Sequence, residues 1–364
     1  MRTSRKVLVA LGAAVLAPSA AAYRFAIEYR RRAGFPVRRP ARETPDAYGL
    51  PFEIVAVPSE AGPLPGWFVP APGGRPAPAV VLVHGWESNR ARMLPNARFL
   101  HAAGFASLLF DVRGHGDNPP ETLPISAAEF GADARAAIEL AADRSDVTSV
   151  AILGHSMGAI GAAIAAAHDP RIAALVMTAA PADPRRLTRR TFQLAGLRMP
   201  GLIAHPLAAL TTRVYLRPRG HAPSDVSATA AVRRYPGPIL IVHGAQDEVV
   251  GADNAVRLER AANGLAGRIV ELLILPEGRH RWLYEDPAYR GRIATFLAHN
   301  LDGAAEPDRA AARAVAATVR RPPDTDGPFG ALQRPAAATP APVGPDGTSG
   351  GPEQAVDDPD LVRS

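Results

Sequence analysis

The sequence predicts an α/β fold with a mostly parallel central sheet and helices on both faces. Short, continuous apolar runs recur along the middle of the chain, and segments with helical periodicity separate them. A run that is apolar at every position is typical of a strand buried on both faces, and strands that alternate with helices form parallel sheets. Residues 182–236 interrupt this alternation with helical and proline-rich stretches, which predicts an inserted helical cap.

Each expected element follows from its own pattern. Apolar runs rich in β-branched residues or leucine predict strands at 52–57, 79–83, 106–111, 149–153, 173–177, 239–242 and 269–275. Apolar residues at helical spacing predict helices at 90–103, 127–142, 157–167, 252–262 and 289–300.

Composition excludes several classes of protein. The chain has 364 residues and no cysteine, so disulfides, thiolate metal sites and a cysteine nucleophile are ruled out. The net charge of +6 is unevenly spread: residues 1–42 carry ten basic residues against one acidic residue. Residues 43–301 carry 25 basic and 24 acidic residues and show no basic recognition motif, so we expect no nucleic-acid partner.

The flanks of the α/β domain (43–301) have distinct compositions. In the N-terminal segment (1–42), three basic residues precede an uncharged apolar run at 7–23 and a small-residue pattern at 20–22. Seven arginines follow between residues 24 and 42, and positive charge there resists translocation. We expect a single-pass membrane anchor; the alternatives are a cleaved signal peptide with secretion and a soluble structural helix. The tail (302–364), rich in alanine and proline, is expected to be disordered.

The strongest chemical signal is Gly154-His155-Ser156-Met157-Gly158, at the junction between an expected strand and an expected helix. A serine on such a tight turn holds its oxygen exposed, and the flanking glycines let the strand and the helix pass closely. The amide of Met157 then lies at a helix N-terminus, where it can stabilise a developing oxyanion.

With this motif the chain resembles the α/β-hydrolase superfamily over roughly residues 50–301. Residues 80–86 (VVLVHGW) look like the strand and the His-Gly oxyanion loop of that superfamily, and residues 111–116 (DVRGHG) look like a structural turn common in it. The resemblance implies an oxyanion hole formed by the backbone amides of Trp86 and Met157.

The resemblance also implies a triad in the order serine, acid, histidine. Asp247 lies in a loop after the expected strand 239–242, and His280 lies in a loop after the expected strand 269–275. In acyl-transfer chemistry His280 would deprotonate Ser156, and Asp247 would orient the imidazole. Two other acids remain open as alternatives to Asp247: Glu248, its neighbour, and Asp183, which follows an earlier strand.

The other histidines are assigned structural positions. His84 is expected to brace the oxyanion loop and His155 to fill the turn at Ser156. We interpret a further five as surface, packing or cap residues: His101, His168, His205, His221 and His299. Their spacing fits no metal site, and we expect neither a metal nor a cofactor.

The cap has a composition of its own. Residues 182–220 contain eight arginines and one acid, interleaved with large apolar residues. This pattern indicates an amphipathic lid with its apolar face on the active site, or a lid that also contacts anionic lipid or binds an acidic or acyl-bearing substrate.

These features predict a serine hydrolase that cleaves carboxylic esters of small molecules through an acyl-enzyme intermediate. A peptidase or amidase of the serine aminopeptidase branch, or an acyltransferase, uses the same triad and remains an alternative. A non-catalytic binding module on a hydrolase scaffold is a further alternative, because fold does not imply function.

Overall fold

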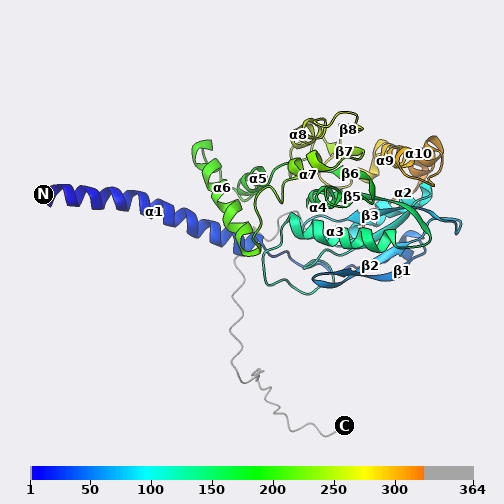
Figure 1. Ribbon diagram of the computed structural model, residues 1–364, viewed down its shortest axis with the longest axis horizontal. Helices are drawn as coiled ribbons and strands as arrows, with labels where there is room; N and C mark the ends of the chain where they lie inside the picture. The colour runs from blue at the N-terminus through cyan, green and yellow to red at the C-terminus, as the bar shows by residue number, and fades with distance from the viewer. Residues whose placement is uncertain (1, 324–364) are drawn as a thin grey trace, which may run out of the picture. The chain divides into compact units, whose positions relative to one another are not determined.

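The computed structural model describes residues 2–323, and within residues 2–16 the backbone alone. Its centre is an eight-stranded sheet with strand order β1-β2-β4-β3-β5-β6-β7-β8 (Figure 1). The pairs β1/β2 and β2/β4 are antiparallel, and the pairs from β4 through β8 are parallel. The predicted α/β fold with a mostly parallel sheet is confirmed.

The strands are β1 (Glu53–Ser59), β2 (Gly62–Val69), β3 (Ala77–Val83), β4 (Ala106–Phe110), β5 (Val147–His155), β6 (Ile172–Thr178), β7 (Ile239–Gly244) and β8 (Val270–Leu275). The helices are α1 (Arg2–Ala33), α2 (Leu94–Ala103), α3 (Ala127–Ala142), α4 (Met157–Ala166), α5 (Pro184–Leu194), α6 (Gly201–Leu216), α7 (Ala228–Arg234), α8 (Asp253–Ala262), α9 (Pro287–Asn300) and α10 (Pro307–Ala316).

Strand β3 shows how the sheet divides the core into two layers. All seven of its residues are buried, and successive side chains point to opposite faces. Val81 and Val83 pack in the cluster that contains α3, α4, α7 and α8, whereas Val80 and Leu82 pack in the cluster that contains α2, α9 and α10. A strand with two buried faces has no polar position, which is why its pattern in the sequence is continuous rather than alternating.

Strand β2 is missing from the sequence-based prediction. Its sequence, GPLPGWFV, contains two prolines and two glycines, which read as turn residues. The strand forms because Trp67, Phe68 and Val69 are buried between β1 and β4. Tertiary burial therefore outweighs the local preference for a turn.

The inserted cap lies between β6 and β7, as predicted, but it is smaller than residues 182–236. Helices α5 and α6 form the cap. Helix α7 instead packs against the sheet layer, where Ala228, Ala231 and Val232 are fully buried in the same cluster as α4 and α8. The prediction of the cap's C-terminal limit was therefore wrong, because the alanine-rich sequence of α7 gave no sign of which surface it would cover.

Helix α1 contacts the cap through its C-terminal end. Phe25 and Tyr29 pack edge-on against Phe192 of α5, with ring centroids 5.3 and 5.6 Å apart. The Tyr29 hydroxyl lies 2.7 Å from Thr191 Oγ1, and Arg30 donates a hydrogen bond to the carbonyl of Val214 in α6. Among the helices that the structure describes, none is both long and apolar enough to cross a membrane.

The expectation that residues 302–364 form a disordered tail is wrong for its first part. Residues 307–316 form α10, with Ala310 and Ala314 fully buried in the cluster that contains α2 and α9. Arg290 of α9 holds the end of this helix by donating hydrogen bonds to the carbonyls of Ala314 and Val315. Alanines four residues apart form a small apolar stripe, which composition alone does not distinguish from a disordered segment. Residues 324–364 lie outside the described residues.

Candidate active site

Ser156 sits on a sharp turn between β5 and α4, with φ 55° and ψ −118°. A non-glycine residue rarely adopts such a backbone, so the surrounding packing must enforce it. The flanking glycines permit the packing: a Cβ on Gly154 would lie 2.2 Å from the carbonyl oxygen of Gly158. A Cβ on Gly158 would lie 2.3 Å from the carbonyl oxygens of both Val83 and His84. The local sequence thus forces the serine out at the carboxyl end of the sheet.

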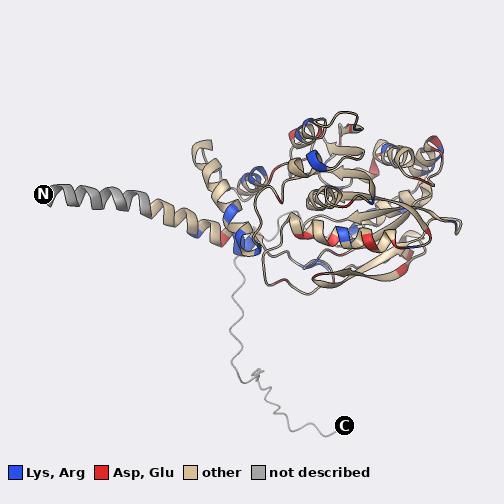
Figure 2. Cartoon of the chain, viewed as in Figure 1, with Lys and Arg blue, Asp and Glu red and all other residues tan. Residues whose placement is uncertain are grey.

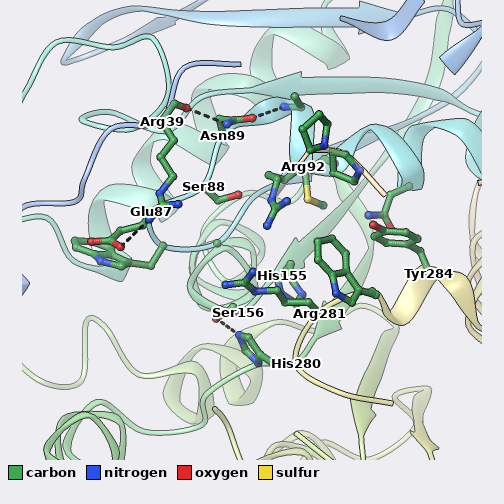
Figure 3. A pocket seen from close by; sticks show the side chains of 18 of the residues that line it. Arg39, Glu87, Ser88, Asn89, Arg92, His155, Ser156, His280, Arg281 and Tyr284 are labelled. Carbon is green, nitrogen blue, oxygen red and sulfur yellow. Dashed lines mark hydrogen bonds and ion pairs between the residues drawn. The ribbon is translucent and has the colours of Figure 1, made fainter. Parts of the chain in front are cut away.

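The structure brings Ser156, His280 and Asp247 together in one hydrogen-bonded line. Figure 3 shows the contact between Ser156 and His280. His280 Nε2 lies 3.2 Å from Ser156 Oγ, and His280 Nδ1 lies 2.8 Å from Asp247 Oδ2. The three residues come from loops that follow β5, β7 and β8, three parallel strands whose carboxyl ends share one edge of the sheet. This geometry is that of a nucleophile, a base and a residue that orients the base.

Asp247 is held as a carboxylate by its surroundings. Burial is the largest single influence and raises the pKa of Asp247, but hydrogen bonds from His243 and His280 together outweigh it, so the pKa lies well below its ordinary value. The backbone amides of Val249 and Val250 also donate to Oδ1, at 2.9 and 2.8 Å. A fixed negative charge beside Nδ1 favours the tautomer that leaves Nε2 free to accept a proton from the serine.

His243 is a neighbour of the acid that the sequence did not single out. Its side chain is fully buried, and Nε2 lies 3.2 Å from Asp247 Oδ2 and 2.8 Å from the carbonyl oxygen of Val250. The feature of the sequence that could have identified His243 is its position four residues before Asp247, at the end of an apolar strand.

The loop after β3 lies directly against the serine turn. A Cβ on Gly85 would lie 3.3 Å from both the carbonyl oxygen of His155 and Ser156 Cβ. His84 fixes this loop: its Nδ1 bonds to the carbonyl of Gly85, and its Nε2 accepts from the amide of Val112. Burial lowers the pKa of His84 to about 4, so the ring is neutral and braces the loop as expected. Trp86, in this loop, and Met157, at the start of α4, line one cavity together with Ser156.

The alternative acids lie elsewhere. Glu248 is exposed, and Asp183 caps α5 by accepting from the amides of Arg185 and Arg186. His155 packs beneath the triad, with its ring centroid 5.1 Å from that of His280.

Two contributions to the site come from segments that the sequence did not connect with it. Arg190 of α5 hydrogen-bonds to the backbone carbonyls of Glu248 and Val249, which fastens the cap to the loop that carries Asp247. Residues 37–40, 42 and 43, in the segment that follows α1, line the larger cavity beside Ser156. The basic residues of this segment indicated a membrane surface when read alone, and only the path of the chain places them beside the active site.

Comparison with known proteins agrees with this geometry. A protein family described as serine aminopeptidase, S33, matches residues 74–233. An uncharacterized protein of Mycobacterium tuberculosis is 32% identical over 237 residues, which are 65% of this chain and 75% of that protein. An uncharacterized protein of Salmonella typhi is 26% identical over 242 residues, covering 64% of this chain and 74% of the relative.

Solved structures show the same fold at low sequence identity. An esterase from Pyrococcus furiosus superimposes with a TM-score of 0.59 at 19% identity, over 73% of this chain and 97% of the esterase. An acylaminoacyl peptidase from Pyrococcus horikoshii superimposes with a TM-score of 0.53 at 16% identity, over 71% of this chain and 43% of the peptidase. Together with the sequence relatives, these findings show that the chain belongs to the α/β-hydrolase superfamily. Within that superfamily it matches the serine aminopeptidase family, and it is a hydrolase.

Proposed function

We propose that this hydrolase cleaves carboxylic esters through an acyl-enzyme intermediate on Ser156. The observation that carries the proposal is the continuous hydrogen-bonded line from Ser156 Oγ through His280 to Asp247. His280 takes the proton of Ser156 as its oxygen attacks the ester carbonyl, and returns a proton to the leaving alcohol. The amides of Trp86 and Met157 stabilise the oxyanion, and each such donor contributes about 3 kcal/mol. Water then releases the acyl group by the same steps.

The choice of an ester rests on the apolar surroundings of the serine. A cavity beside Ser156 is lined by side chains such as Ile160, Leu187, Leu216 and Val226. Such a lining suits a hydrocarbon acyl group, because burying each CH₂ contributes about 0.8 kcal/mol.

A fluorophosphonate probe tests the nucleophile directly. The wild-type protein should be labelled at one site, and Ser156→Ala should remove the label while the circular dichroism spectrum stays unchanged. If the wild type is not labelled, or if Ser156→Ala is labelled equally, the serine hydrolase proposal is wrong and the scaffold has a binding role instead.

A peptidase or amidase is the second candidate, since the matching family is described as serine aminopeptidase. A panel of p-nitrophenyl esters of rising chain length, measured beside aminoacyl anilides, decides between the two. Higher kcat/KM on the anilides overturns the choice of an ester. Faster product formation with an added alcohol acceptor than with water alone favours an acyltransferase.

For localisation, we propose that the N-terminal segment attaches the protein to a membrane as a single-pass anchor, with secretion after cleavage of a signal peptide as the alternative. The apolar run at 7–23 and the arginines on both sides of it support this proposal. Alkaline carbonate extraction of membranes tests it: an anchored protein stays in the pellet at full length. Recovery of full-length protein in the soluble fraction contradicts the anchor, and recovery of a chain that lacks the first 22 residues favours the signal peptide.

Contact between the cap and a membrane surface is proposed on separate grounds. Leu202 and Ile203, near the start of α6, are 90% and 54% exposed. Basic residues lie on α5 and where α1 meets α6 (Figure 2). Apolar side chains beside arginines are typical of surfaces that bind anionic lipid. Flotation with phosphatidylglycerol vesicles should carry the wild-type protein upward more than Leu202→Asp, and equal flotation would contradict a role for the cap.

A further inference from the structure

Two cavities open on the reactive serine. The larger, of about 340 Å³, and the smaller, of about 110 Å³, are both lined by Ser156 and Trp86. The Ser156 hydroxyl therefore stands where the two cavities meet, and an ester bound there would extend one half into each.

The smaller cavity is apolar and is closed by two elements outside the sheet. Leu187 of the cap lines it together with Tyr29 and Ala33 of α1 and Ile160 of α4. The Tyr215 hydroxyl of α6 helps to hold α1 and the cap in this position: it donates to the carbonyl of Ile125 at 2.6 Å and lies 3.1 Å from the carbonyl oxygen of Ala33. The cavity suits a hydrocarbon chain.

Among the residues that the structure describes, the larger cavity is lined by more basic than acidic side chains. They are five arginines and two glutamates: Arg38, Arg39, Arg42, Arg92, Arg281, Glu43 and Glu87. The glutamates are engaged, because Glu87 pairs with Arg39 at 3.7 Å and Glu43 pairs with Arg320 at 2.8 Å.

Arg92 and Arg281 line the larger cavity together with His155 and Ser156. Figure 3 shows Arg281 beside His155 and Arg92 extending into the same cavity. The guanidinium of Arg92 lies over the ring of Trp282, 5.0 Å from its centroid. Burial, followed by the charge of His280, lowers the pKa of His155 to about 3, and the charges of Arg281 and Arg92 act in the same direction. Both arginines thus contribute positive potential at His155, the residue that precedes Ser156.

The position of His280 assigns a role to each cavity. In ester cleavage the histidine that takes the serine proton must deliver a proton to the leaving alcohol, so the alcohol departs on the side of the histidine. Among the residues that the structure describes, His280 lines the larger cavity and is not part of the smaller one. The acyl half then occupies the apolar cavity, and the alcohol half occupies the cationic one.

We propose that the substrate is an acyl ester whose leaving alcohol carries an anionic group, a phosphate or a carboxylate, which Arg92 and Arg281 bind. This inference rests on the proposed esterase function and names the substrate class of the same site. Ser156 Oγ attacks the carbonyl carbon, the C–O bond to the anionic alcohol breaks, and the alcohol leaves with the proton carried by His280. Water then hydrolyses the acyl-serine and releases the carboxylic acid, so no further reactant is required.

The test compares three hexanoate esters on the full-length protein. The leaving groups are 4-hydroxybenzoate, 4-hydroxyphenyl phosphate and the neutral 4-hydroxybenzamide, and each kcat/KM is divided by the ester's own rate with hydroxide. Both anionic esters should exceed the neutral one by about tenfold or more, because a hydrogen bond to a charged group contributes about 1.5–3 kcal/mol. The larger of the two anionic values distinguishes phosphate from carboxylate. The preference should also shrink as salt is raised, since charges in an open cavity are screened.

Substitutions of Arg92 and Arg281 test whether these two residues cause the preference for anionic esters. Arg92→Gln and Arg281→Gln should each lower the ratio of anionic to neutral kcat/KM by about tenfold, and Arg→Lys at the same positions should restore part of it. Arg260→Gln, on the exposed face of α8, removes the same charge away from both cavities and should leave the ratio unchanged.

The outcomes separate this inference from the proposed function. Equal corrected rates on all three esters, or a faster rate on the neutral ester, would contradict the proposal that the substrate is anionic. If Ser156 is still labelled by the fluorophosphonate probe, the proposal of a serine hydrolase stands. A wild-type protein that neither takes the fluorophosphonate label nor cleaves any of the esters overturns both. An anionic preference that survives Arg92→Gln, Arg281→Gln and the double variant overturns the assignment to these arginines.

Discussion

The substitution Gly158→Ala should push the turn that carries Ser156 away from the loop at His84 and Gly85. The new Cβ would lie 2.3 Å from two backbone carbonyl oxygens, those of Val83 and His84. An ordinary contact between these atoms is longer by about 1 Å, and backbone oxygens at the end of a central strand are unable to turn aside as a side chain would. Helix α4 must then move away from β3 by a similar distance.

The magnitude follows from this displacement. Overpacking a close-packed interior costs about 1–3 kcal/mol, and we expect at least the upper value because the contacting atoms belong to the backbone. For a domain of this size that corresponds to a melting temperature lower by about 6–12 °C. Fluorophosphonate labelling should fall by at least about 10²-fold, since the amide of Met157 moves with the start of α4.

Thermal unfolding followed by circular dichroism and a labelling time course measure the two effects. Gly264→Ala is the matched control, because its Cβ would meet the carbonyl oxygen of Ala261 at 3.4 Å, an ordinary contact. It should melt and label like the wild type. If Gly158→Ala melts and labels like Gly264→Ala, the close approach of α4 to β3 is not what holds the serine turn, and the reasoning is refuted.

Three other outcomes are expected. Asp247→Asn should lower kcat by about 10⁴-fold, because an amide favours the wrong tautomer of the catalytic imidazole. Tyr29→Ala should lower the free energy of unfolding by about 3 kcal/mol, since it removes an aromatic ring from the contact between α1 and the cap. It should also lower kcat/KM for long acyl esters more than for acetate esters. His221→Gln should destabilise the protein by about 1 kcal/mol at mildly acidic pH, because His221 Nε2 lies 2.6 Å from Glu129 Oε1.

The pH dependence of the third outcome follows from the two pKa shifts. The hydrogen bond with Glu129 raises the pKa of His221. Burial is the largest influence on Glu129 and raises its pKa, but hydrogen bonds from His221 and Ser126 outweigh it and the pKa is lowered. The pair therefore stabilises the fold above the lowered pKa of Glu129, and this stability is lost as pH rises through the raised pKa of His221. Urea unfolding at several pH values should show the wild type and His221→Gln converging at alkaline pH.

Contrary results would be informative in each case. If Asp247→Asn has the same kcat as the wild type, Asp247 does not take part in the mechanism. If Tyr29→Ala lowers kcat/KM equally for short and long esters, α1 does not help to bind the acyl chain. If the difference in free energy of unfolding between the wild type and His221→Gln is the same at every pH, the contact between His221 and Glu129 is not ionic.

Local sequence determined most strands of the sheet and the serine turn, whereas Asp247 and His280 were assigned from the resemblance to a family. Continuous apolar runs form strands with two buried faces, and Gly154 and Gly158 are required wherever a strand and a helix approach so closely. These features depend on residues near one another in the chain, so a pattern of a few positions records them. Strand β2 and helix α10 were not predicted from the sequence, because they form through burial against distant segments rather than through their own composition.

Tertiary structure alone decided what surrounds the serine. Arg42 and Tyr29 belong to a segment that looks like a membrane-targeting arm in the sequence, yet one lines the cationic cavity and the other the apolar cavity. Arg190 reaches the loop of Asp247 from a helix that lies outside the sheet. Contacts between residues so far apart in the chain depend on how α1 and the cap pack together, and no periodicity or spacing encodes that packing.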